Sequence, residues 1–398
     1  MDRRTFLKRL AIGGATLAAA TQLRNPHLPA VVQATDDRPN ILIILVDQMR
    51  YPQWFPAQST LDTYLPGLAR LRNGAVAFGS YYTAASACSP ARAALLTGLY
   101  CHQTYCLRTI SNPRIPELHR GFPTYGSFLR NHGYQTYWFG KWHLGPTQDL
   151  EPYGFSGGTF PSPNGGPSQG MTVDSQISDQ FLNWLKTQSS GPWCTTVSLV
   201  NPHDIAWYWR FTQQIDRQAQ PEPIFTQLPA NFETPAQHSA NNKPRLQVAL
   251  RRLIALFGGY IPFGGPGFPD RWLRMLDMYL FFHQIVDAQI TRLLDALAAH
   301  PRFGSNTIII FSSDHGEYAG SHGLRNKGSA AYEEGIRVPL YVKDPTGRYT
   351  GAPELERPQL CSSVDIAPLL LTIAPAAHNG AISLVMPILP HAMISAPS

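Results

Sequence analysis

Five apolar runs of strand length recur along this chain, and each one stops abruptly at polar residues. The runs cover residues 40–46, 134–139, 195–200, 307–312 and 338–342. The first run, Asn40–Val46, shows no alternation, which is typical of a central parallel strand buried on both faces. Helical stretches separate the runs, including residues 124–131 and 272–299. Strands that alternate with helices predict an α/β fold with a central, mostly parallel sheet and helices on both faces.

The polar residues that follow these runs predict one common site. They are Asp47-Gln48, Lys141-Trp142-His143, His203, Asp314-His315 and Lys343-Asp344. Ligands of such sheets bind beyond the carboxyl ends of the strands, so we expect these side chains to converge on one crevice. Lys141 and His143, two residues apart, would lie on the same side of an extended chain.

A second motif, Cys88-Ser89-Pro90-Ala91-Arg92, predicts a helix N-terminus. Ser89 can cap the helix and Pro90 suits its first turn, so Cys88 should face the positive end of the helix dipole. Arg92, one turn further on, adds a fixed positive charge. This arrangement predicts a site for a sulfate or phosphate group. For an arbitrary cysteine, a buried free thiol before an ordinary helix is the commoner case.

The pattern C-x-P-x-R-x4-T-G at residues 88–98 resembles the first signature of the sulfatase family, and Gly140–Gly145 resembles the second. The resemblance extends from about residue 38 to residue 375. It implies an alkaline-phosphatase-like fold and hydrolysis of a sulfate monoester to alcohol and sulfate. It also implies that a formylglycine-generating enzyme oxidises Cys88 to formylglycine (3-oxoalanine), whose hydrate is the nucleophile.

The same resemblance assigns roles to the other site residues. It implies a metal site at Asp47, Gln48, position 88, Asp314 and His315, with Ca²⁺ as the ion and Mg²⁺ or Mn²⁺ as alternatives. Many members have a second aspartate where Gln48 stands, and some have asparagine where His315 stands. Arg92 and Lys141 would counter the charge of the sulfate, and His143 would exchange a proton with the nucleophile. His203 and Lys327 would steady and protonate the leaving oxygen.

Two other functions fit the same residues. A phosphonate or phosphate ester hydrolase of the same superfamily would use the same crevice and metal, and such relatives also carry an Asp-Gln pair. An inactive homologue that binds sulfated glycans would not need Cys88. A two-zinc phosphatase fits worse, because the chain shows no second set of His and Asp ligands. We therefore expect a sulfatase that acts on a sulfated small molecule or glycan.

The ends of the chain predict export and an unusual tail. Residues 1–34 have the form of a twin-arginine signal, with Arg3-Arg4 before a short apolar run, which predicts export by the Tat translocase to the periplasm or the extracellular space. Residues 35–375 form the predicted catalytic domain, in which residues 210–269 are a predicted insertion or lid. The family's usual small C-terminal antiparallel-sheet domain is expected to be missing, because residues 376–398 are an apolar, proline-rich tail.

The net charge of the chain does not itself indicate a polyanionic partner. The chain carries a net charge of +6, of which +4 lies in residues 1–34, so the remainder carries +2. This near-neutral balance gives no argument for binding nucleic acid or an acidic membrane. No segment after the predicted signal is apolar for long enough to span a bilayer.

Overall fold

The computed structural model describes residues 38–52, 58–111, 114–158, 165–211, 215–216, 220–328, 330–353 and 355–374. Every described residue belongs to the compact unit that begins at Arg38. The predicted export signal and the predicted tail at residues 376–398 lie outside the described residues. The predictions made for them, including the missing C-terminal domain, stay predictions.

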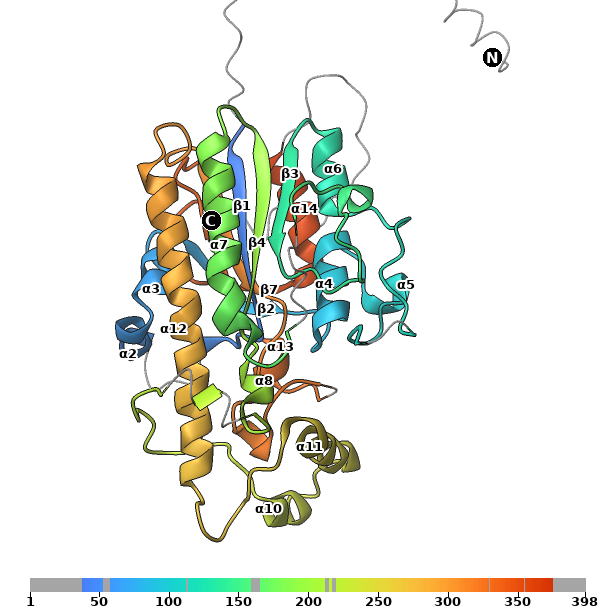
Figure 1. Ribbon diagram of the computed structural model, residues 1–398, viewed down its shortest axis with the longest axis vertical. Coiled ribbons are helices and arrows are strands. Elements are labelled where there is room, and N and C mark those ends of the chain that lie inside the picture. Colours follow the sequence, from blue (N-terminus) through green and yellow to red (C-terminus); the bar gives the residue numbers. More distant parts are fainter. Residues whose placement is uncertain are drawn as a thin grey trace, which may run out of the picture. The chain divides into compact units, whose positions relative to one another are not determined.

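One sheet of seven strands forms the centre of the described residues, in the order β3-β4-β1-β5-β6-β2-β7 (Figure 1). The strands are β1 (Asn40–Asp47), β2 (Val76–Tyr82), β3 (Gln135–Gly140), β4 (Trp193–Pro202), β5 (Thr307–Ser313), β6 (Leu340–Lys343) and β7 (Arg357–Ser362). β1 pairs in parallel with β4 on one side and with β5 on the other. The predicted α/β fold with a mostly parallel sheet is confirmed.

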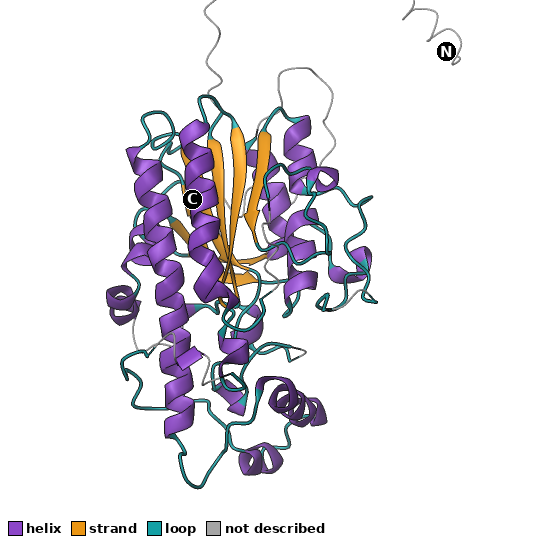
Figure 2. Cartoon of the chain, viewed as in Figure 1, coloured by secondary structure: helices purple, strands orange, loops and turns teal. Residues whose placement is uncertain are grey.

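Helices cover both faces of the sheet (Figure 2). Odd-numbered residues of β1 from Ile41 to Leu45 enter one apolar core, and even-numbered residues from Leu42 to Val46 enter the other. The first core is closed by α4, α6 and α14, the second by α3, α7 and α12. The described helices are α2 (Gln58–Tyr64), α3 (Pro66–Arg72), α4 (Cys88–Thr97), α5 (Cys101–Thr104), α6 (Tyr125–Asn131), η2 (Glu151–Tyr153), α7 (Gln169–Thr187), α8 (Ile205–Tyr208), α10 (Pro235–Ala240), α11 (Arg245–Gly258), α12 (Asp270–Ala299), η3 (Ser321–Gly323), α13 (Glu333–Ile336), η4 (Ser363–Asp365) and α14 (Ile366–Ile373).

The strand β6 runs antiparallel to both of its neighbours, β5 and β2. A reversed strand needs no crossover helix, and the connection from β5 to β6 instead carries residues 314–339 over the carboxyl end of the sheet. The strand also begins two residues later than its apolar run, after Pro339, which cannot donate to a ladder.

The predicted insertion contains two helices that the sequence analysis does not assign, α10 and α11. Both lie beyond the carboxyl ends of the central strands, and α11 lies next to α8 (Figure 1). A search of the described helices finds none whose length and apolar character would let it cross a bilayer.

Candidate active site

The structure brings most of the predicted site residues together at the carboxyl ends of the central strands. Asp47 ends β1, Lys141 follows β3, His203 follows β4 and Asp314 follows β5. All four are buried. The convergence that the strand ends predict is therefore found for these residues.

The predicted convergence is wrong for Lys343 and Asp344. Because β6 is reversed, its last residues lie at the opposite end of the sheet, where the parallel strands begin. There the Lys343 ammonium donates to the carbonyl oxygen of Arg70 at 3.0 Å, and the Asp344 carboxylate accepts from the backbone N–H of Thr346 at 2.9 Å. These two residues stabilise loops and do not contribute to the site.

Helix α4 begins at Cys88 itself, two residues earlier than the sequence suggests. The N-cap is Ala87, which has no side-chain cap, so the expectation that Ser89 caps the helix is wrong. The Ser89 hydroxyl instead donates to the carbonyl oxygen of His143 at 2.7 Å and accepts from the backbone N–H of Ile110 at 2.9 Å. Ser89 thereby fixes the loop of His143 to the start of α4. Cys88 stands in the first turn, as the motif predicts.

The Cys88 thiol is completely buried and faces basic side chains. Its Sγ lies 3.0 Å from the Lys327 ammonium and 3.2 Å from Nε2 of His315. Burial and the Asp47 carboxylate raise the pKa of this thiol, but Lys327, Lys141 and His315 outweigh them and hold the pKa well below its usual value. The position therefore favours an anion, as a helix N-terminus with converging cations should.

The carboxylate of Asp47 is the centre of the charge network. It lies 2.6 Å from the Lys141 ammonium, 2.9 Å from Nδ1 of His203 and 3.2 Å from a guanidinium nitrogen of Arg92. Burial by itself would raise the pKa of Asp47, but Lys141, His203 and Lys327 hold it well below the usual range. Asp47 is therefore ionised while it is buried.

Arg92 joins the ends of several strands. Its Nε donates to Asp314 at 2.8 Å, and its Nη1 donates to the carbonyl oxygen of Lys141 at 2.8 Å and to the Ser198 hydroxyl at 2.9 Å. Burial lowers the pKa of Arg92, but Asp314 and Asp47 outweigh this and raise it. The guanidinium thus holds the two carboxylates together in addition to lending the site a positive charge.

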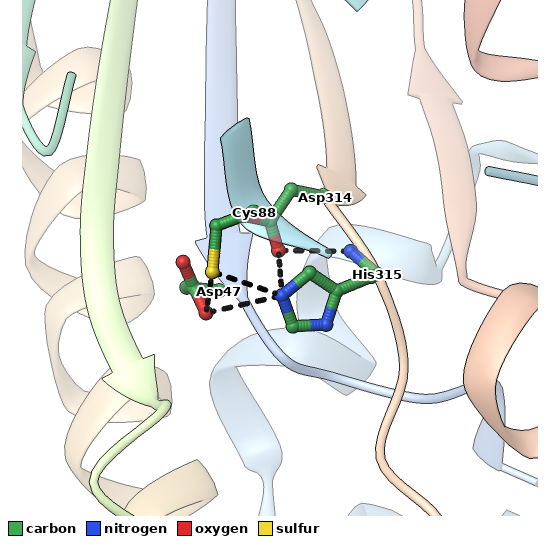
Figure 3. A group of neighbouring side chains, drawn as sticks. All are labelled: Asp47, Cys88, Asp314 and His315. Atoms are coloured by element: carbon green, nitrogen blue, oxygen red, sulfur yellow. Dashed lines mark hydrogen bonds and ion pairs between the residues drawn. The ribbon is translucent and has the colours of Figure 1, made fainter. Parts of the chain in front are cut away.

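Four buried side chains offer donor atoms for a cation. Asp47, Cys88, Asp314 and His315 each present one ligand atom, and these atoms lie within 4.8 Å of one another (Figure 3). Nδ1 of His315 lies 2.9 Å from the carbonyl oxygen of Gly316, to which it can donate, so that Nε2 is turned toward the carboxylates. Metal-ligating histidines are commonly oriented in this way.

The charge of this donor set also suits a divalent cation. Burial and the nearby Asp47 carboxylate raise the pKa of Asp314 to about 6, although His315 and Arg92 oppose them. Carboxylate oxygens with one imidazole are ligands that Ca²⁺, Mg²⁺ or Mn²⁺ accept. Four of the five predicted ligand positions therefore fit such a cation, whereas the amide oxygen of the fifth, Gln48, accepts from the Lys327 ammonium.

The loop of Lys141 and His143 is not extended as the sequence analysis assumes. Gly140 has φ 96°, and a Cβ there would lie 2.1 Å from the carbonyl oxygen of Ser198, so the turn after β3 requires glycine. His143 also has a positive φ, 56°. Its Nε2 lies 3.1 Å from the carbonyl oxygen of Ile110, and burial lowers its pKa although the nearby Cys88 opposes this. A neutral imidazole next to position 88 can accept a proton.

Glu317 is a buried site residue that the sequence analysis misses. Its carboxylate accepts hydrogen bonds from the side-chain amide of Gln48 and from the backbone N–H groups of Asn326 and Ala319. Because the carboxylate can only accept, the NH₂ group of Gln48 must face it. The amide oxygen of Gln48 therefore faces Lys327, whose ammonium donates to it at 2.8 Å. The position of Glu317, two residues after His315, was the available signal.

His203 is covered by the backbone of Gly165. Its Nε2 lies 3.1 Å from the Gly165 carbonyl oxygen, which also accepts from the Trp207 indole N–H at 2.7 Å. On the other side of the ring, Nδ1 lies 2.8 Å from the Lys327 ammonium. His203 and Lys327, which the sequence predicts as a pair, are in contact.

Comparison with known proteins gives consistent matches. A family model described as Sulfatase matches residues 39–376. The chain is 27% identical to the uncharacterized sulfatase YidJ of Escherichia coli K12, over 85% of this chain and 68% of that protein. It is 24% identical to the Delta 4,5-hexuronate-2-O-sulfatase of Bacteroides thetaiotaomicron, over 85% of this chain and 70% of that protein.

Two solved structures share the fold. A putative sulfatase from Bacteroides thetaiotaomicron aligns with a TM-score of 0.68 and 22% identity, over 89% of this chain and 74% of that one. The phosphonate monoester hydrolase of Agrobacterium radiobacter aligns with a TM-score of 0.62 and 22% identity, over 85% and 74% of the two chains.

Proposed function

Because this chain belongs to the sulfatase family and is itself a sulfatase, we propose that it cleaves a sulfate monoester through a formylglycine made from Cys88, with a divalent cation bound beside this residue. The geometry of Cys88 carries this proposal. A fully buried thiol at a helix N-terminus, with a lysine and an imidazole within 3.2 Å, has the surroundings of a nucleophile and not those of a structural cysteine.

The two absent groups would have distinct chemistry. Formylglycine at position 88 would supply, as its hydrate, a hydroxyl nucleophile. A divalent cation held by Asp47, Asp314, His315 and position 88, with Gln48 as a further proposed ligand and Ca²⁺ as the first candidate, would place a positive charge beside a sulfate oxygen. Arg92 and Lys141 orient the Asp47 carboxylate and add positive charge on the same side.

The chain's own candidate acids and bases reach position 88 from different segments of the chain. The ammonium of Lys327 and the imidazole of His203 are in contact with each other, and either can hold the proton that the leaving oxygen needs. His143 approaches from the loop that Ser89 ties to α4 and, being neutral, can take a proton from a hydroxyl at position 88.

The decisive experiment examines residue 88 directly. We would express the protein in a host with a formylglycine-generating enzyme and analyse the tryptic peptide Asn73–Arg92 by mass spectrometry. An aldehyde at position 88, together with loss of aryl sulfate turnover in Cys88→Ala, supports the proposal. An intact thiol in protein that turns over, or repeated turnover by Cys88→Ala, would refute it.

One observation favours a second candidate function. The structural match to a phosphonate monoester hydrolase, together with the pair Asp47-Gln48, suits hydrolysis of a phosphonate or phosphate ester in the same crevice. Aryl sulfate, aryl phosphate and aryl phosphonate esters assayed side by side distinguish the two functions. The ester with the highest kcat/KM identifies the group that the site is built for.

Three further proposals concern maturation and destination. We propose that residues 1–34 direct export through the Tat translocase to the periplasm or outside the cell. A formylglycine-generating enzyme and a sulfated small molecule or glycan are the other proposed partners. Cell fractionation of the wild type and of an Arg3→Lys/Arg4→Lys variant tests export, because loss of the arginine pair should leave the protein inside.

A further inference from the structure

Helix α11 carries an apolar face that points away from the rest of the described structure. Its side chains Leu246, Leu253, Leu256 and Phe257 are each more than half exposed, as is Tyr260 just beyond its end. The spacing of these residues places them on one face of a helix. We name this set of five side chains the α11 ridge. Contiguous apolar surface of this kind usually marks an interaction site.

The face of α11 that adjoins the ridge packs against the rest of the described structure and holds the helix in place. Leu250 and Ile254 are buried in a small core with Tyr318 and Leu324. Gln247 is buried too, and its side-chain oxygen accepts from the Tyr332 hydroxyl at 2.6 Å. The ridge is therefore presented on a fixed support, and no shift of the helix is needed to expose it.

The charge around the ridge is locally positive, although residues 35–398 together carry a net charge of only +2. No aspartate or glutamate occurs between Glu233 and Asp270. On α11, Arg245 and Arg252 are exposed beside the ridge, and neither forms an ion pair with another residue that the structure describes. This local composition, apolar side chains flanked by arginines, is the pattern of helices that lie in the interface of an anionic bilayer.

The same charges argue against a second copy of the chain as the partner. A symmetric dimer would place the same patch on both sides of the contact. Arg245 and Arg252 of each copy would then meet arginines, with no carboxylate on α11 to pair with them. Lipid phosphates, by contrast, match both charges.

We propose that the α11 ridge docks on the surface of a membrane that contains anionic phospholipids. The ridge enters the boundary between headgroups and acyl chains, while Arg245 and Arg252 contact lipid phosphates. The contact is peripheral, and the helix lies in the plane of the interface.

The position of α11 gives this contact a consequence for the site. The helix lies beyond the carboxyl ends of the central strands (Figure 1), and Leu250 packs close to Gly328, next to Lys327. Docking would hold the loop that carries Lys327 near the lipid surface. Substrates at or near a bilayer would then reach the site at a raised local concentration.

Vesicle binding by the purified full-length chain tests the proposal. The protein is mixed with vesicles of phosphatidylglycerol and phosphatidylethanolamine, or of phosphatidylcholine alone, and the bound fraction is measured by sedimentation. We expect binding to the anionic vesicles that weakens with added salt, and at least a 10-fold weaker partition onto phosphatidylcholine.

Two variants and a matched control separate the contributions. Leu256→Ser/Phe257→Ser should weaken partition by about 10-fold or more, because both side chains lose their apolar burial. Arg245→Gln/Arg252→Gln should weaken it by a similar factor, because each arginine contributes about 5-fold at an anionic surface. Leu360→Ser, which changes a leucine that is 75% exposed on β7, should leave partition unchanged.

Three outcomes would overturn the proposal. They are absence of binding to anionic vesicles at low salt, equal loss of binding in Leu360→Ser, and a wild-type dimer in analytical ultracentrifugation that Leu256→Ser/Phe257→Ser converts to monomer. Thermal melts of every variant test whether the fold is intact, which separates loss of binding from loss of folding. None of these measurements depends on the reaction that the active site performs.

Discussion

Replacing Glu317 with glutamine isolates the part that this buried carboxylate plays in the metal site. One carboxylate oxygen accepts from the backbone N–H groups of Asn326 and Ala319, and the other accepts from the NH₂ group of Gln48. In Glu317→Gln, the new side-chain amide can keep its oxygen as the acceptor for the N–H groups of Asn326 and Ala319. Its NH₂ group then points at the NH₂ group of Gln48. Two donors would then face each other, so Gln48 must turn its amide over.

The turned amide changes what Gln48 offers to the site. In the variant, the amide oxygen of Gln48 faces residue 317 and its NH₂ group faces Lys327. In the wild type, the Lys327 ammonium instead donates to the Gln48 amide oxygen at 2.8 Å. The proposed cation loses an oxygen ligand. Loss of a residue that orients a ligand typically weakens metal binding about 10- to 100-fold, which is about 1.4 to 2.7 kcal/mol.

Isothermal titration of the metal-free protein with Ca²⁺, Mg²⁺ and Mn²⁺ measures this effect directly. Glu334→Gln is the matched control, because Glu334 is also buried but accepts from Asn231 and does not contact Gln48. The double variant Gln48→Glu/Glu317→Gln restores a donor facing an acceptor and should recover most of the affinity. An unchanged Kd in Glu317→Gln, or an equal loss in Glu334→Gln, would show that Glu317 does not act through Gln48.

Three further predictions follow from the same geometry. His203→Gln should lower kcat for an alkyl sulfate by about 10²-fold and for nitrophenyl sulfate by much less, since a good leaving group needs no acid; equal losses would contradict the role of His203 as an acid. Chelation should abolish turnover. Ca²⁺ at about 100 times its Kd should raise the free energy of unfolding by about 2.7 kcal/mol, which is measured as a higher Tm. An unchanged Tm would argue against the metal site. Burial lowers the pKa of His283 to about 4, so the unfolded chain binds more protons between about pH 4 and pH 6.5, and wild-type stability should fall by about 3 kcal/mol on acidification through that window. Urea unfolding of His283→Gln at pH 7 and pH 4.5 should show a smaller fall, and an identical fall would refute the assignment.

The central part of the fold was predictable because its signals are local. The uninterrupted run Asn40–Val46 is buried on both faces, as such a run should be. Strand β7, with the sequence Arg357-Pro358-Gln359-Leu360-Cys361-Ser362, carries no such signal, because an edge strand can hold proline and exposed polar residues. The direction of β6 was not predictable either, since an apolar run gives no information on which way its neighbours point.

The site residues, too, were predictable only where their signal is local in the sequence. Asp47, Lys141, His203 and Asp314 were found because each ends or directly follows a strand, and the carboxyl ends of parallel strands lie together. Glu317 escaped notice because its role depends on which atom of Gln48 it meets, and that is settled by packing between segments distant in the sequence. The start of α4 at Cys88 was missed because tertiary contacts of Ser89 outweigh its preference for a cap position.

The pairing of β1 with β5 determines when the Cys88 thiol becomes enclosed during synthesis and folding. The groups that enclose its thiol include His315 and Lys327, which are made more than 200 residues later in the chain. Until β5 has been synthesised and has paired with β1, that side of the thiol has no cover, whereas in the folded protein the residue is 0% exposed. Under the proposed maturation, the modifying enzyme would therefore reach Cys88 most readily before β5 pairs with β1. Slow closure of so long a loop prolongs that interval. The parallel pairing of β1 with β5 would thus also set the time available for the proposed maturation of Cys88.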